Sequence, residues 1–236
     1  DDYGGRLENR ARIFVEIADS IKKKAGEDYP ILVRLSASDF LEGGYPIEDT
    51  KVLAQLLEKA GVHAFDGMYG WHECPVPSVQ YSVPQGYWVY VAEELKKVVS
   101  VPVAAGTRIN DLLFAEQILA EGKADLIYMA RPLIADPELP NKAIRDELDD
   151  IRPCIACCHC IDLIETPITC TGNPRAGRED EYTVRPTAKP KKVMVIGGGP
   201  AGMQAAITAA QRGHEVTLYE KGDRLGGQML VAVLPP

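Results

Sequence analysis

The sequence predicts an α/β protein built on parallel β-sheets. In residues 1–150, short apolar segments alternate with segments of helical periodicity, and this unit recurs four times. Residues 193–220 place a glycine-rich turn between two further apolar segments. The strand segments are apolar throughout, which is typical of strands buried on both faces of a parallel sheet under helices. Four such units form half of a (β/α)8 TIM barrel, and a doubly wound sheet is the alternative.

Each element has its own pattern. The helix predicted over residues 7–25 carries apolar residues at helical spacing, and the helix predicted over 111–121 can be capped by Asn110 or Asp111. Residues 66–86 are rich in proline and form a long loop. The other elements predicted in residues 1–150 are strands at 31–35, 62–65, 101–105 and 126–129 and helices at 47–60, 88–99 and 137–148. The elements predicted after residue 192 are a strand at 193–196, a helix at 201–212 and a strand at 216–219.

The positions of polar residues favour the barrel over the doubly wound sheet. Residues of this kind follow predicted strand ends, where barrel enzymes keep their functional groups, namely Arg34, His72, Arg108 and Arg131. The last two strands are followed by Gly106-Thr107-Arg108 and by Ala130-Arg131, at the place where barrels commonly bind a phosphate. Each of these arginines can instead pair with a nearby carboxylate, and His72 can be an ordinary packed residue.

A run of cysteines separates the two α/β parts. Cys154, Cys157, Cys160 and Cys170 form a C-x2-C-x2-C run with a fourth cysteine soon after, a pattern that can hold one iron–sulfur cluster. Zinc is the alternative, because it also takes four thiolates, and Cys158 and His159 are further candidate ligands for it. A cluster needs four ligands, so Cys158 is expected to be a bystander. Cys74 lies apart and is expected to be an ordinary thiol.

The glycine-rich turn is a dinucleotide-binding fingerprint in the required context. Gly197 permits the tight turn, Gly199 lets the backbone approach a pyrophosphate, and Gly202 lets the helix pack on the strand. Glu220 ends the next strand, where an acid accepts a hydrogen bond from the adenosine ribose. The trailing Gly226-Gly227-Gln228 favours FAD over NAD. Flavin-type parts on both sides also favour iron–sulfur over zinc, since zinc carries no electrons.

Composition sets the outer limits. The chain has 236 residues with a net charge of −8, and its Lys and Arg residues are scattered, which excludes a nucleic-acid footprint. No apolar run approaches the roughly 20 residues of a membrane span, and no signal peptide is visible, so a cytoplasmic protein is expected. Asp1 follows no Met and Pro236 comes soon after a second strand, so a piece of a longer protein is expected.

Several motifs, in the same order, resemble the Old Yellow Enzyme-like NADH:flavin oxidoreductases that carry an iron–sulfur cluster, the family of 2,4-dienoyl-CoA reductase, 2-enoate reductase and trimethylamine dehydrogenase. They span nearly the whole chain. The matching stretches are YGGRLENRAR at 3–12, VRLS at 33–36, GWHE at 70–73, TRIND at 107–111, MARPLIAD at 129–136, the cysteine run, GGGPAG at 197–202 and GGQ at 226–228. The spacing of the third cysteine departs from the dienoyl-CoA reductase branch and is closer to trimethylamine dehydrogenase.

The resemblance implies three cofactors in series. Residues 1–150 would be the C-terminal half of an FMN-binding barrel, 151–175 a [4Fe-4S] segment, 176–192 a linker and 193–236 the truncated start of an FAD/NAD(P)-binding domain. Arg34 would contact the FMN pyrimidine edge, and the phosphate would be held by Arg108, Ala130 and Arg131. FAD would be contacted by Gly197, Gly199, Ala201, Gly202, Glu220 and Gln228.

The implied reaction is the reduction of an activated C=C bond in an unsaturated acid or acyl-CoA. Electrons would pass from NAD(P)H to FAD, to the cluster, to FMN and to the alkene. His72 would help donate the proton, together with a tyrosine of the absent barrel half, and the substrate pocket would be lined by Glu73, Cys74, Pro75 and Val76. The chain alone is expected to be inactive, and self-association is left open.

Two other readings remain open. An amine dehydrogenase of the same architecture would bind a cation through aromatic residues, for which the candidates are Tyr69, Trp71, Tyr81 and Trp88. A non-catalytic zinc-binding module is the alternative from a different class of protein.

Overall fold

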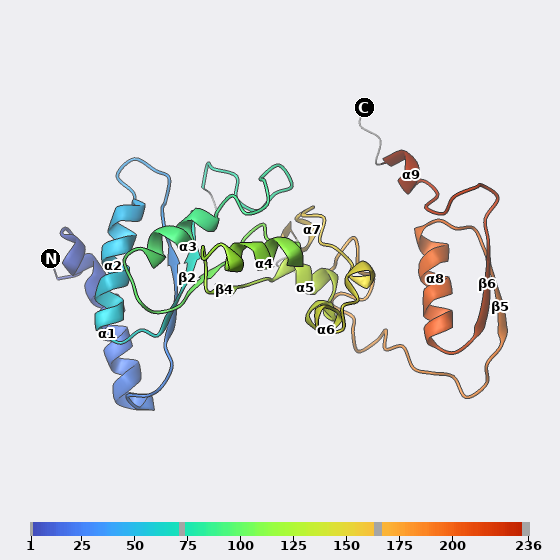
Figure 1. Ribbon diagram of the computed structural model, residues 1–236, viewed down its shortest axis with the longest axis horizontal. Helices are drawn as coiled ribbons and strands as arrows, with labels where there is room; N and C mark the ends of the chain where they lie inside the picture. The colour runs from blue at the N-terminus through green and yellow to red at the C-terminus, as the bar shows by residue number, and fades with distance from the viewer. Residues whose placement is uncertain (1, 71–73, 163–166, 233–236) are drawn as a thin grey trace. The chain divides into compact units, whose positions relative to one another are not determined.

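The computed structural model describes residues 2–70, 74–162 and 167–232, which form two compact units, Asp1–Gly177 and Arg178–Pro236 (Figure 1). The first unit contains a parallel four-stranded sheet in the order β1-β2-β3-β4. A doubly wound sheet reverses its strand order at a switch point, so four consecutive strands in sequential order favour the wall of a barrel. The strands of this sheet are β1 (Leu32–Ser36), β2 (Ala64–Met68), β3 (Val103–Ala105) and β4 (Leu126–Ile127).

All four predicted strands of this unit exist, and two differences from the prediction matter for the site. Arg34 lies within β1, as it does in the predicted strand 31–35, so it was wrong to group it with residues that follow a strand end. The second strand was expected to end at Phe65 and in fact runs on to Met68. Asp66 and Gly67 are poor strand formers, yet they pair in parallel register with Arg34 and Leu35 of β1. The long loop therefore begins after Met68.

The helices of the first unit were predicted well as far as residue 120. Asp111 is the cap of α4, because its Oδ1 accepts a hydrogen bond from the backbone N–H of Phe114 at 2.7 Å. These helices are α1 (Leu7–Ala25), α2 (Ile47–Lys59), α3 (Val89–Lys96) and α4 (Leu112–Ala120).

The single polar helix predicted over 137–148 was wrong. The structure has two short helices, α5 (Arg131–Ala135) and α6 (Leu139–Ile144), followed by a 3-10 turn at Leu148–Asp150. Pro137 separates the two helices, and Asp146 has a positive φ of 58° that ends helical geometry. A further short helix, α7 (His159–Asp162), lies in the cysteine segment and was not predicted.

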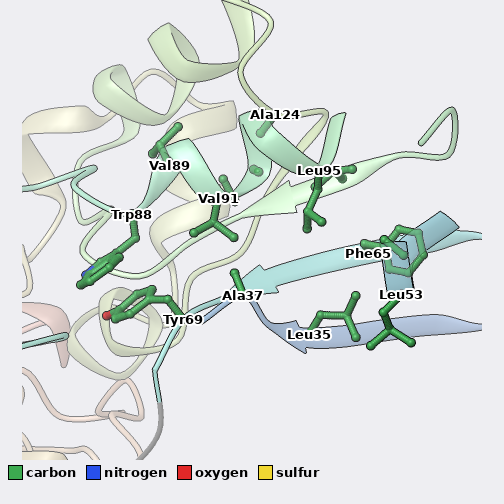
Figure 2. Close-up of a cluster of buried hydrophobic side chains, with 14 of the residues drawn as sticks. Leu35, Ala37, Leu53, Phe65, Tyr69, Trp88, Val89, Val91, Leu95 and Ala124 are labelled. Carbon is green, nitrogen blue, oxygen red and sulfur yellow. The ribbon is translucent and has the colours of Figure 1, made fainter. Parts of the chain in front are cut away.

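The core lies between the sheet and its helices, with α3 packed on β2 and β3 and α2 packed on α1 and α3. Figure 2 shows Leu35 and Phe65 of the strands with Leu53 of α2 and Leu95 of α3 in this cluster. The expectation that the strands are buried on both faces was wrong for β1 in the described chain. Leu35 is 3% exposed but Leu32, on the other face, is 69% exposed.

The second unit is one strand–helix–strand motif. Its strands β5 (Lys192–Ile196) and β6 (Glu215–Tyr219) pair in parallel, and α8 (Pro200–Gln211) connects them and packs on both (Figure 1). These elements match the predicted ones to within a residue or two. A last short helix, α9 (Met229–Ala232), was not predicted.

Within the described ranges, no helix has the length and apolar character needed to cross a bilayer.

Candidate functional site

A cavity of about 350 Å³ lies at the C-terminal ends of β2, β3 and β4, a size suited to a small-molecule ligand. It brings together four of the residues predicted to hold FMN, namely Arg34, Arg108, Ala130 and Arg131. Its other lining residues include Met68, Val79, Thr107, Tyr128, Ile134, Cys160 and Ile168.

Arg34 reaches this cavity from β1 and is held by two neighbours. Its Nε donates a hydrogen bond to Oδ2 of Asp66 at 2.7 Å, and its guanidinium carbon lies 5.0 Å from the ring centroid of Tyr128. The hydrogen bond to Asp66 raises the pKa of Arg34, so the guanidinium stays charged. Burial raises the pKa of Tyr128. Arg34 therefore has the carboxylate partner that was the alternative reading of its sequence position. It also lines the cavity.

Arg108 is buried and is held by carbonyl groups of the loop before α3. Its Nε donates to the carbonyl oxygen of Val83 at 2.8 Å, and one terminal nitrogen lies 3.4 Å from the carbonyl oxygen of Tyr81. Thr107 and Arg108 both have positive φ, 59° and 57°, which is uncommon for residues other than glycine. Strain of this kind is concentrated at ligand sites.

Arg131 begins α5, directly after Ala130, and one of its terminal nitrogens donates to the carbonyl oxygen of Val79 at 2.7 Å. No carboxylate of the described residues pairs with Arg108 or Arg131. Two cations without acidic partners beside one cavity suit an anionic ligand group.

The four predicted cluster ligands, Cys154, Cys157, Cys160 and Cys170, line a second, small cavity of about 20 Å³ together with Cys158. Ala156 and Cys158 have positive φ, 56° and 61°, and alternate with residues of negative φ. Such an alternation turns successive backbone N–H groups toward one concavity, a feature of many anion and iron–sulfur sites.

These residues fit an iron–sulfur cluster in donor chemistry. A tetrahedral zinc site needs its sulfurs about 4 Å apart, because each Zn–S bond is about 2.3 Å. No group of three His, Cys, Asp or Glu residues in the described part of the chain is gathered closely enough to hold a single metal ion. The four thiols line one small cavity, and thiolates are the usual ligands of iron–sulfur clusters.

The two further candidate zinc ligands, His159 and Cys158, have other contacts. Nε2 of His159 lies 3.0 Å from Oγ1 of Thr169. Sγ of Cys158 lies 3.6 Å from the carbonyl oxygen of Val79, and Sγ of Cys157 lies 3.2 Å from Oγ1 of Thr171. The contact with Thr171 lowers the pKa of Cys157, whereas burial raises the pKa of Cys158 and of Cys160.

The two cavities share a wall. By contrast with the cysteine cavity of about 20 Å³, the cavity of about 350 Å³ is named the large cavity, and Arg131, Ile134 and Cys160 line both. A cluster held by Cys160 would therefore adjoin whatever occupies the large cavity.

The predicted catalytic and substrate residues are only partly visible. His72 and Glu73 lie outside the described residues. Cys74 donates a weak hydrogen bond through Sγ to the carbonyl oxygen of Asp39 at 3.8 Å, and Val76 packs against the core. A third cavity of about 660 Å³ reaches the cysteine segment, and its lining includes Tyr69, Gly70, Ser78, Gln80 and Cys158. Cys74, Pro75 and Val76 do not line it.

Residue-based reasoning missed Asp66, Tyr128 and the loop carbonyl groups at 79–83. The predicted second strand ended at Phe65, so nothing in the sequence indicated that Asp66 pairs with Arg34. The carbonyl contacts left no signal, because any residue supplies them.

In the second unit, the glycines differ in their backbone geometry and surroundings. Gly197 has a φ of 101°, and a Cβ on Gly202 would collide with the carbonyl oxygen of Gly197. A Cβ on Gly199 would meet nothing within 4 Å, which leaves room beside the turn. Gly226 N–H donates to the carbonyl oxygen of Gly198 at 2.8 Å, so the segment that contains Gln228 is tied to the same turn.

Glu220 follows β6 and bridges the turn. Its carboxylate accepts hydrogen bonds from the N–H groups of Gly222 at 2.9 Å and Gly198 at 2.7 Å, and these bonds lower its pKa. Ala201 lies exposed in the first turn of α8, and Gln228 is exposed just before α9.

The chain is similar to several known proteins. It is 48% identical over 242 residues to an NADH oxidase of Thermoanaerobacter brockii, 46% identical over 239 residues to a metal reductase of Desulforamulus reducens, and 38% identical over 256 residues to a cinnamate reductase of Clostridium sporogenes. Each match covers 100% of this chain and between 36% and 38% of the relative. The chain thus spans little more than a third of the length of these relatives.

The chain is also similar to solved structures of oxidoreductases. A complex of 2-naphthoyl-CoA reductase with 2-naphthoyl-CoA matches with a TM-score of 0.92 and 40% identity, over 97% of this chain and 36% of that one. Histamine dehydrogenase from Rhizobium sp. 4-9 matches with a TM-score of 0.84 and 30% identity, over 97% of this chain and 34% of that one.

Family comparison agrees with the two units. Residues 192–236 match the FAD-dependent oxidoreductases. Residues 1–150, which build the large cavity, match the NADH:flavin oxidoreductase / NADH oxidase family, and the chain belongs to that family of flavin-linked oxidoreductases.

Proposed function

We propose that this chain is the electron-transferring part of an NAD(P)H-dependent flavoenzyme that reduces an activated C=C bond. The observation that carries the proposal is the wall shared by the large cavity and the cysteine cavity through Arg131, Ile134 and Cys160. It would bring a flavin and an iron–sulfur cluster next to one another. The proposed electron order is NAD(P)H, FAD, [4Fe-4S], FMN and substrate, because flavins too far apart for hydride transfer can still exchange single electrons through a cluster.

The first unit would hold FMN as half of a (β/α)8 barrel. We assign residues 1–150 to the barrel half, 151–175 to the cluster segment, 176–192 to the linker and 193–236 to the truncated FAD/NAD(P)-binding domain. The sequential parallel order of β1 to β4 supports the barrel. In the large cavity, Arg108, Ala130 and Arg131 would bind the phosphate, and Arg34 would meet the electron-rich pyrimidine edge.

The cysteines would hold one cluster through Cys154, Cys157, Cys160 and Cys170. The all-sulfur donor set and the adjacent cavity support this assignment. When bound, the cluster would supply one-electron transfer. The protein's own contribution would be a wall that excludes water from the shared boundary and N–H groups at 155–158 that stabilise the negative charge on the sulfurs.

In the second unit, the Gly197–Gly202 turn would face the FAD pyrophosphate. The open space beside Gly199 and the carboxylate of Glu220 at the turn support this role. Ala201 and Gln228 would complete the contacts.

Amine oxidation, the alternative to alkene reduction, would need aromatic residues around a cationic substrate. Two of the aromatic residues that could surround a cation, Tyr69 and Trp88, stack on each other in the core with ring centroids 3.2 Å apart (Figure 2). Tyr81 is 77% exposed, and Trp71 lies outside the described residues. His72 would help donate the proton to the reduced alkene, and residues 73–76 would line the substrate. A location in the cytoplasm is part of the same proposal.

One experiment tests the whole assignment. The intact protein, purified without oxygen, would be analysed for FMN, FAD, iron and acid-labile sulfide. It would then be assayed with NADH and NADPH against cinnamate and an enoyl-CoA thioester, and separately with histamine and an artificial electron acceptor. We expect both flavins, about four irons and NAD(P)H-dependent saturation of an alkene. Histamine oxidation without alkene reduction, or zinc in place of iron, would overturn the proposal.

A further inference from the structure

Asp66 and Arg34 lie opposite one another in the register of β2 and β1. Side chains at directly paired positions of neighbouring strands project from the same face of the sheet. The ion pair at 2.7 Å between Asp66 Oδ2 and Arg34 Nε is therefore fixed by two backbones and does not depend on a loop.

The atom that Asp66 binds is informative. It holds Nε, at the base of the guanidinium, and Nε is the one guanidinium nitrogen with a hydrogen-bond partner among the described residues. The two terminal nitrogens are then available to the large cavity, which Arg34 lines with a side chain that is 55% exposed. The terminal nitrogens carry most of the N–H donors of a guanidinium. An arginine that served packing alone would not leave these nitrogens beside a cavity.

Tyr128 fixes the plane of the same group. Its ring lies under the guanidinium at 5.0 Å, and its hydroxyl lies 3.2 Å from Oγ1 of Thr107. A Cβ on Gly106 would collide with this ring, so position 106 accommodates no side chain while Tyr128 keeps its place. The guanidinium is thus held at one edge by Asp66 and on one face by Tyr128.

Asp66 also has a feature that stability does not explain. Its Oδ1 is buried and accepts no hydrogen bond of good geometry from the described residues. The Tyr128 hydroxyl is a polar neighbour of this carboxylate, because burial and, to a smaller extent, the Asp66 carboxylate raise the pKa of Tyr128. A buried acceptor without a partner is unfavourable, and such groups in native proteins are rare and often functional.

We propose that Asp66 is a positioning residue for the flavin-binding arginine: it holds Nε so that the terminal nitrogens of Arg34 face the pyrimidine edge of FMN. This inference rests on the proposed function, since it takes FMN as the ligand of the large cavity. Tyr128 is the platform on which the positioned guanidinium lies.

The test is a double-mutant cycle on FMN affinity in the intact protein, freed of FMN and titrated with it while flavin fluorescence is followed. We expect Asp66→Ala to weaken FMN binding about tenfold, equal to about 1.4 kcal/mol. Asp66→Asn keeps a hydrogen-bond acceptor for Nε and should stay within about threefold of the unchanged protein. In an Arg34→Ala background, Asp66→Ala should change the affinity less than about twofold, because Asp66 acts through Arg34.

The chain offers a matched control in the pair Arg10–Asp49, an ion pair of 2.8 Å. The Asp49 side chain is 27% exposed, against 23% for Asp66, and it lines none of the cavities described above. Asp49→Ala should leave FMN affinity unchanged, and FAD affinity should be unchanged in every variant.

Three results decide the matter. If the unchanged protein binds no FMN, the proposed function itself fails. If it binds FMN and Asp66→Ala binds as tightly or more tightly, only the role of Asp66 is overturned. An equal loss with Ala and Asn, or a loss that persists without Arg34, would mean that Asp66 acts on the fold and not on the arginine.

Discussion

The carboxylate of Asp136 holds the backbone of Arg152, two residues before the first cysteine of the cysteine segment. Oδ2 accepts a hydrogen bond from the Arg152 N–H at 2.9 Å and from Nζ of Lys142 at 2.6 Å, and Oδ1 accepts from the Glu138 N–H at 3.1 Å. This side chain is 5% exposed. One buried carboxylate therefore ties the end of α5 to the entrance of the cysteine segment.

Replacing Asp136 should loosen that entrance. Asp136→Asn removes the charge that three donors share, and we expect unfolding to become easier by about 2 kcal/mol and the iron content per FMN to fall. Urea unfolding and iron analysis of the intact protein would measure both. The exposed neighbour Asp149, changed to Asn, is the control and should alter neither.

The same carboxylate predicts the behaviour in acid. Burial opposes its ionisation, but the hydrogen bonds from Lys142, Arg152 and Glu138 outweigh burial and lower the pKa of Asp136. A lowered pKa means that its stabilisation is present above the ordinary aspartate value of about 3.9 and is lost as the pH falls through the lower, folded value. Asp136→Asn should flatten this part of the stability curve, and an unchanged curve would contradict the assignment.

The proposed ligand set predicts that serine substitutions at the five cysteines of the segment have different effects on the cluster. Serine in place of Cys154, Cys157, Cys160 or Cys170 should abolish the cluster, seen as loss of brown colour, iron and sulfide. Cys158→Ser should retain it, because the Cys158 thiol contacts Val79 and is not needed as a fourth ligand. A cluster lost in Cys158→Ser and kept in Cys170→Ser would reverse the ligand set.

Glu220→Ala should weaken the retention of FAD while FMN stays bound, because the two sites lie in different compact units. The change removes the acceptor for the Gly198 and Gly222 N–H groups as well as the proposed partner of the ribose. Flavin extraction and chromatography would give the FAD to FMN ratio. A parallel loss of both flavins would count against a role for Glu220 in FAD binding.

Two glycines of the turn should respond differently to alanine. Gly202→Ala places a Cβ against the Gly197 carbonyl, so the second unit should be destabilised even without FAD. Gly199→Ala meets open space at an ordinary φ of −73°, so the fold should persist while FAD binding is lost to the added methyl group. Circular dichroism of the FAD-free protein, beside FAD titration, separates the two effects. Retained FAD affinity in Gly199→Ala would place the pyrophosphate elsewhere.

His72→Ala should slow alkene reduction by about 10²- to 10⁴-fold, the usual range for a positioned proton donor. NAD(P)H oxidation by an artificial one-electron acceptor should be nearly unchanged, because that path needs no proton at an alkene. Steady-state assays with both acceptors measure the contrast. A fall in both activities would make His72 structural.

Much of the fold could be read from residue patterns, and the reasons for the exceptions are physical. Apolar periodicity located α1 to α4 and all six strands, because burial on a helical or strand face constrains residue type strongly. The stretch 131–150 was misread, because its breaks depend on Pro137 and on the positive φ of Asp146 and not on hydrophobic spacing.

The candidate site was also predicted only in part from the sequence. Arg34, Arg108 and Arg131 could be chosen as candidates because a charge within or just after an apolar strand is unusual, and all three line the large cavity. Asp66 was missed because its meaning depends on being paired with Arg34 across the sheet, and strand register is not visible in one sequence.

The wall shared by the two cavities has a consequence for engineering and for damage. Of its three side chains, Arg131 would bind the phosphate and Cys160 the iron, which leaves Ile134 as the position where the barrier to electron tunnelling can be altered without touching a ligand. Oxidation of Cys160 would add oxygen atoms to the same wall. Damage at the proposed cluster would therefore also alter the lining of the large cavity.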